Sequence, residues 1–86
     1  MNEKTIKVLV EAGAIRKVLI IAEGSAIHVD IVTQSGPITA TTNKGAIKTW
    51  ATLDASARWI RGVGIGSAQL EIGKWLPSQK GMPLKH

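Results

Sequence analysis

The stretch IKTWATLDASARWIRGVGI, residues 47–65, decides the expected fold, because a strand, a capped helix and a helix stop follow one another in it. Thr52 is placed to cap the helix, and Asp54 lies in the first turn, where a carboxylate opposes the positive end of the helix dipole. Apolar side chains recur at helical spacing, at Leu53, Ala57 and Ile60. The stretch therefore predicts an amphipathic helix over 53–63.

Three glycines follow this helix in the pattern G-x-G-x-G, at Gly62, Gly64 and Gly66. A dinucleotide-binding loop follows a strand and opens a helix, whereas this pattern closes a helix and opens a strand. Gly64 is instead placed to adopt the left-handed conformation, with Ile65 folding back onto the last turn. We interpret the glycines as helix-capping residues.

Upstream, residues 17–33 predict a β-hairpin with the two-residue loop Gly24-Ser25. Pairing across this loop gives one uniformly apolar face, with Val18, Ile20 and Ala22 opposite Ile31, Val29 and Ile27. The other face combines polar residues with three apolar ones, Leu19, Ile21 and Val32. An exposed patch of that kind is uncommon on a monomer, so we expect either cover by the first helix or a homodimer interface there.

The remaining segments complete an α+β fold. A third strand is expected at 38–42, a turn at Asn43-Lys44-Gly45, a returning strand at 46–50 and a last strand at 67–75. Residues 5–10 fit a helix capped by Asn2, although their β-branched alternation leaves a strand as the competing interpretation. We predict two short helices with an antiparallel sheet of three to four strands plus a C-terminal strand, in the order α-β-β-β-(β)-α-β. One domain would span 1–76, and 77–86 would form a tail.

Composition narrows the class of protein. The 86 residues include no cysteine, and the longest apolar run, 18–22, is far shorter than the roughly 20 residues of a membrane span. Without a leader or cysteines, we expect a cytoplasmic protein that does not enter a membrane. Eleven Lys and Arg against six Asp and Glu give a net charge of +5, which favours polyanionic partners.

The residues that could do chemistry form no catalytic constellation. His28 and Asp30 share one strand face, but no serine stands in a nucleophile-elbow motif, and we interpret both as polar residues of a strand. The six carboxylates show neither an acidic pair nor metal-ligand spacing. We therefore expect no catalytic residue, no metal and no cofactor, and a protein that is not an enzyme. The candidate nucleic-acid-binding residues are basic, namely Lys44, Lys48, Arg58 and Arg61.

Two segments carry a resemblance to a known group. TIKVLVEAGAIR, residues 5–16, and TLDASARWIRGVGIGSAQLEI, residues 52–72, resemble small proteins of proteobacterial plasmids and integrative elements, some of them labelled ParC-type partition-associated. The resemblance rests on structural motifs, so it implies no active site. It implies a role in plasmid partition or mobile-element maintenance, through DNA or through a partition or transfer protein, and it favours the helix at 5–10.

Two functions of different classes follow from these observations. The first is a small basic accessory protein that binds DNA or a DNA-bound partner. The alternative is a protein–protein adaptor or self-assembling, dimeric module without direct nucleic-acid contact, with its interface at Leu19, Ile21 and Val32.

Overall fold

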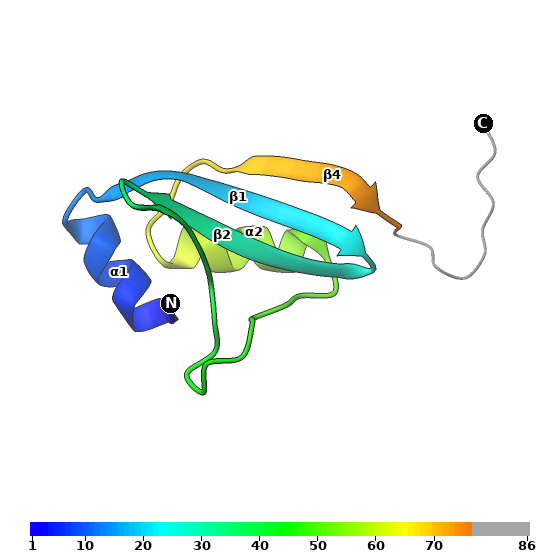
Figure 1. Ribbon diagram of the computed structural model, residues 1–86, viewed down its shortest axis with the longest axis horizontal. Coiled ribbons are helices and arrows are strands. Elements are labelled where there is room, and N and C mark those ends of the chain that lie inside the picture. The colour runs from blue at the N-terminus through cyan, green and yellow to red at the C-terminus, as the bar shows by residue number, and fades with distance from the viewer. Residues whose placement is uncertain (77–86) are drawn as a thin grey trace.

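The computed structural model describes residues 1–76, which form two layers: a four-stranded sheet with two helices on one face (Figure 1). The elements are α1 (Glu3–Glu11), β1 (Ile15–Gly24), β2 (Ala26–Thr33), β3 (Gly36–Thr39), α2 (Leu53–Gly62) and β4 (Gln69–Trp75). The strand order in the sheet is β3-β2-β1-β4. This confirms the α+β class, and the tail expected at 77–86 lies outside the described residues.

The β1–β2 hairpin has the predicted register. Ala22 pairs with Ile27, Ile20 with Val29 and Val18 with Ile31, and Gly24 takes a positive φ of 63° in the loop. These six side chains face the helices and are all buried. Ile6 from α1, Ile60 from α2 and Val63, which caps α2, complete most of the core. Packing of these aliphatic side chains, each worth about 1.5–3 kcal/mol when fully buried, holds the two layers together.

The sheet is mixed, whereas an antiparallel sheet was predicted. β1 pairs antiparallel with β2, and β2 with β3, but β4 runs parallel to β1. The reason is α2, which packs against β2 and returns the chain across the sheet before β4 begins. A strand that follows such a crossover runs in the direction of the strand before it, so β4 is parallel to β3 and hence to β1.

The strand predicted at 46–50 is wrong as a continuous element. Its residues form only isolated bridges, Thr41 with Ile47 and Ile27 with Trp50. The backbone changes partners along this segment, because Lys48 N–H donates to Ala40 C=O whereas Trp50 N–H donates to Ile27 C=O. Two different neighbours prevent a regular ladder. β3 likewise begins and ends earlier than the predicted 38–42.

The helix at the N-terminus is confirmed over the competing strand. Asn2 Oδ1 accepts a hydrogen bond from Thr5 N–H at 3.0 Å, and the Ile6 side chain is fully buried against the sheet. Because α1 lies on the same side as α2, it leaves the opposite sheet face uncovered (Figure 1). Cover of Leu19, Ile21 and Val32 by the first helix is thereby excluded.

α2 begins and ends as its sequence predicts. Thr52 Oγ1 accepts from Ala55 N–H at 3.1 Å. At the other end Gly64 has a φ of 102°, and Ile65 N–H donates to Ile60 C=O, which is the Schellman arrangement. The buried stripe differs by one residue from the prediction, since Ser56 is buried and Ala57 is exposed. Ser56 Oγ donates to Leu53 C=O at 2.8 Å, so this hydroxyl is buried without losing a hydrogen bond.

Replacing Thr52 with alanine tests the importance of this cap. The variant loses the acceptor for Ala55 N–H, and we expect the free energy of unfolding to fall by about 1 kcal/mol. Thr49→Ala is the matched control, because Thr49 is exposed and precedes the helix. Urea denaturation followed by circular dichroism measures both variants. Equal stability of Thr52→Ala and the parent would show that the cap is dispensable.

Candidate functional site

A pair of tryptophans joins the segment before α2 to the helix itself. The ring centroids of Trp50 and Trp59 are 5.1 Å apart at an interplanar angle of 49°. The backbone bridge to Ile27 fixes Trp50, and both rings are partly buried against the core. Lys48 Nζ lies 5.5 Å from the Trp50 ring and 5.8 Å from the Trp59 ring, within the range of a cation–π contact. The pair is therefore packed under a lysine and does not present an open stacking surface.

Glu3 connects this pair to α1. Trp59 Nε1–H donates to Glu3 Oε1 at 3.2 Å, and Lys7 Nζ lies 3.4 Å from Glu3 Oε2. The hydrogen bond from Trp59, helped by Lys7 and by the charge of Lys48, holds the pKa of the Glu3 carboxyl below its usual value of 4.5. One carboxylate thus links the two helices through residues that are 56 positions apart in the chain.

Lys4 and Lys7 lie in the first two turns of α1, Lys48 lies near Glu3, and Lys44 follows Asn43 in the loop beside the helix; we call these four lysines the basic cluster. Lys4 and Lys7 line one shallow hollow together with Asn43, the residue before Lys44. The N-terminal residue brings these segments together, because Met1 C=O accepts from Thr41 N–H and the Met1 ammonium donates to Thr39 C=O. Lys48 lies close enough to Glu3 to affect its pKa.

Sequence reasoning selected two members of this cluster and missed the other two. Lys4 and Lys7 are three residues apart on α1, and they lie on the side of the helix away from the buried Ile6. Once residues 5–10 are predicted as a helix, that spacing indicates that the two lysines lie on the same side of it. Their proximity to Lys44 depends on the pairing of Met1 with 39–41, which no local pattern indicates.

The two predicted arginines lie elsewhere. Arg58 points to solvent from α2 and pairs with Asp54, with Nη2 2.9 Å from Oδ2. Arg61 lines a hollow between α2 and the segment 65–68 that leads to β4. Two residues along a helix turn the side chain by roughly 200°, so Arg61 and Trp59 lie on opposite flanks of α2. Of the four candidates, Lys48 lies near Glu3 of α1, Lys44 follows Asn43, which lines a hollow with Lys4 and Lys7, and Arg61 lies on the other flank of α2.

Charge is distributed unequally over the two sides of the molecule. On the sheet face away from the helices, two lysines oppose three carboxylates: Lys17 and Lys74 against Glu23, Asp30 and Glu71. The rest of the described chain carries seven basic residues and three acidic ones, namely Lys4, Lys7, Arg16, Lys44, Lys48, Arg58 and Arg61 against Glu3, Glu11 and Asp54. The excess positive charge therefore lies away from this open sheet face.

The open sheet face holds Leu19, Ile21 and Val32, each half-buried. The strand register gives each of them at least one polar neighbour: Asp30 and Gln69 flank Leu19, His28 and Glu71 flank Ile21, and Lys17 pairs with Val32. The apolar side chains consequently alternate with polar ones across the strands. An interface centred on these three residues stays a prediction.

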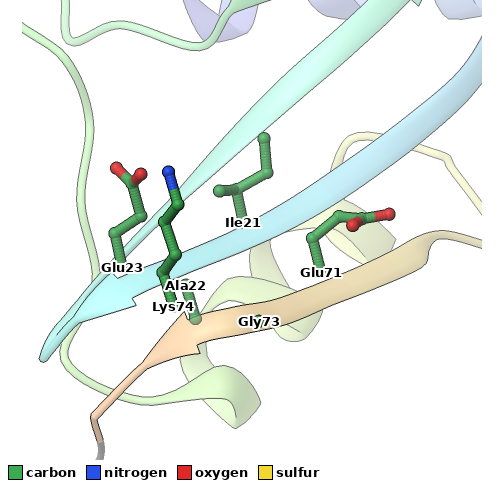
Figure 2. A pocket seen from close by; sticks show the side chains of 6 residues that line it. All are labelled: Ile21, Ala22, Glu23, Glu71, Gly73 and Lys74. Carbon is green, nitrogen blue, oxygen red and sulfur yellow. The ribbon is translucent and has the colours of Figure 1, made fainter.

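A shallow hollow of about 300 Å³ lies where β1 and β4 meet on this face (Figure 2). Its lining includes Glu23, Glu71 and Lys74, and Figure 2 shows the three side chains projecting to the same side as Ile21. It is open to solvent and lined by few apolar side chains, unlike the enclosed apolar pockets typical of small-molecule sites.

His28 and Asp30 come close, with Nε2 3.8 Å from Oδ1. Thr39 Oγ1 donates to the same Asp30 oxygen at 2.8 Å. The carboxylate therefore stands between the imidazole and the hydroxyl, whereas a hydrolytic triad places the imidazole in the middle. These residues form a polar contact between β2 and β3.

Residues 1–76 contain no group of three or more His, Asp or Glu side chains arranged to hold a metal ion. Neither helix in this part of the chain is long and apolar enough to cross a membrane. Comparison of the chain with protein-family models, curated proteins and solved structures gave no match.

The contact between Glu3 and Trp59 predicts a pH-dependent signal. Because the folded pKa of Glu3 is depressed, its ionised form stabilises the fold above pH 4.5, and this contribution is lost as the pH falls through the lower folded value. We expect Glu3→Gln to lower the melting temperature at pH 7 and to differ less from the parent at pH 3. A tryptophan fluorescence titration should show an acidic transition in the parent that Glu3→Gln lacks. Identical titrations of the two proteins would contradict the assignment.

Proposed function

We propose that this protein is a small, non-enzymatic accessory protein that binds nucleic acid, or a nucleic-acid-bound partner, through the basic cluster. The observation that supports this best is that Lys4 and Lys7 share a hollow with Asn43, the residue before Lys44, while Lys48 lies close to Glu3 of the same helix. The sheet face mixes basic residues with Glu23, Asp30 and Glu71, so it is less favourable to a polyanion than the basic cluster. Binding would therefore use the α1 end of the helical layer.

The chemistry of this interaction is electrostatic. Lysine ammonium groups contact phosphate oxygens as point charges, and each phosphate neutralised releases condensed counterions, so affinity falls steeply with salt. The Trp50 and Trp59 rings pack against one member of the cluster, because Lys48 Nζ lies over both of them. Such contacts carry no sequence information by themselves. We expect binding without marked base preference.

The biological setting that we propose comes from the resemblance of residues 5–16 and 52–72 to proteins of plasmids and integrative elements. In that setting the protein would act in the cytoplasm in plasmid partition or mobile-element maintenance. A partition or transfer protein is the partner we propose.

A second candidate function is a self-assembling module without direct nucleic-acid contact. It is favoured by a specific observation, the exposed aliphatic side chains Leu70 and Ile72 on the edge strand β4. Its first test is the molar mass of the parent protein by light scattering at rising concentration. A mass that stays at 9.1 kDa into the high micromolar range would rule it out.

Removing two charges from the basic cluster tests the first proposal. Lys44→Ala, Lys48→Ala should weaken binding to a fluorescent DNA duplex and reduce the slope of log K against log salt by up to about 2, because up to two phosphate contacts are lost. The control is Lys17→Ala, Arg61→Ala, which removes the same charge from two positions outside the basic cluster and outside β4. Fluorescence anisotropy at several salt concentrations measures both.

The control separates a local site from a general effect of net charge. Equal losses of affinity in the two double variants would mean that only net charge matters, and the basic cluster would not be a site. Undetectable binding by the parent even at low ionic strength would contradict nucleic-acid binding altogether.

A further inference from the structure

Among residues 1–76, β4 forms one edge of the sheet. It lies at one end of the strand order, paired with β1 on one side and with no other described strand on the other. The opposite edge, β3, has four residues and contains Pro37, which cannot donate a hydrogen bond. β4 has seven residues and no proline. A strand of this kind exposes backbone groups that can pair with another chain.

The helix-side surface of β4 is also incompletely covered. Leu70 is 45% exposed and Ile72 is 48% exposed, although Leu70 pairs with the buried Ile20 of β1. α2 packs against β2, so it does not cover the outermost strand. A further strand beside β4 would bury both side chains.

An extra residue in β4 gives this edge an unusual charge pattern. Opposite Ile21 to Glu23 of β1, β4 places Glu71 to Lys74, one residue more. Because of this bulge, Glu71 and Lys74 project from the same face of the sheet although they are three residues apart, as Figure 2 shows. Residues of opposite charge therefore stand one on each side of Ile72-Gly73.

We infer that two copies of the chain pair antiparallel through β4, about a twofold axis at Ile72-Gly73. This register places Glu71 opposite Lys74 of the partner subunit, and the symmetry repeats the ion pair. On the helix side it places Leu70 opposite Trp75 of the partner subunit. The result is a continuous eight-stranded sheet with four strands from each copy.

Charge complementarity selects a second copy as the occupant. Glu71 and Lys74 lie at equal distances from the midpoint of Ile72-Gly73. When a second copy of the strand is turned through 180° about that point, its lysine lies opposite the first copy's glutamate and its glutamate opposite the first copy's lysine. A twofold axis at Glu71 would instead bring two identical carboxylates together, which is unfavourable. A peptide from another protein could pair with the same backbone groups, but nothing about its binding requires this symmetry. The inference rests on the self-assembling candidate function and is independent of the basic cluster.

Charge reversal tests the proposed register. Glu71→Lys and Lys74→Glu each turn both ion pairs into repulsions, and we expect each variant to dimerise about tenfold more weakly than the parent. An equimolar mixture of the two variants restores both ion pairs in a heterodimer. Sedimentation equilibrium of each variant and of the mixture, from low micromolar to near-millimolar concentration, measures this. Circular dichroism verifies that each variant is folded.

Further variants distinguish this interface from other surfaces. Ile72→Lys should abolish the dimer, whereas the control Ile47→Lys, at a side chain 59% exposed in the loop before α2, should keep it. Val32→Glu, on the open face but two strands from β4, should also keep it, and so should Lys44→Ala, Lys48→Ala even if DNA binding is lost. A monomeric parent, single charge variants that dimerise normally, a mixture that stays monomeric, or a folded Val32→Glu monomer would each overturn the inference.

Discussion

The apolar face of the β1–β2 hairpin is the constraint on which the rest of the structure depends. Six buried aliphatic side chains alternate with residues that are half-buried or exposed, so one side of the sheet is much more apolar than the other. Both helices pack there, with Ile6 contributed by α1, Ile60 by α2 and Val63 by the cap of α2. A one-residue slip of the register would turn this face to solvent and leave the helices without a surface to cover.

Much of this arrangement could be predicted because it is local. The hairpin register follows from its two-residue loop, and the caps of α2 follow from Thr52 and Gly64, so both were confirmed in detail. What could not be predicted depends on segments distant in sequence. The direction of β4 depends on where α2 crosses the sheet, and the failure of 46–50 to form a strand depends on Trp50 pairing with Ile27 rather than with its hairpin neighbour.

The same distinction applies to the candidate site. The sequence shows which residues are basic but not which of them lie near one another. Their arrangement depends on two long-range contacts, the pairing of Met1 with 39–41 and the hydrogen bond from Trp59 to Glu3. Arg58 illustrates the opposite case. Its place on the exposed side of the helix suggested that it was free to contact phosphate. In the structure it forms an ion pair with Asp54 one turn earlier, and the i, i+4 spacing of the two residues already indicated this pair.

One-sided packing also separates the two surfaces to which we assign binding. Because the helices cover one face, the basic cluster lies beside α1, while the open face and the β4 edge combine acidic and basic residues. A chain with a net charge of +5 would repel its own copy if the contact were made through its basic side. An edge on which Glu71 and Lys74 balance avoids that repulsion and leaves the lysines free to meet phosphate. Self-association and polyanion binding can therefore coexist in one small domain, and the dimer would carry two basic clusters to the same nucleic acid.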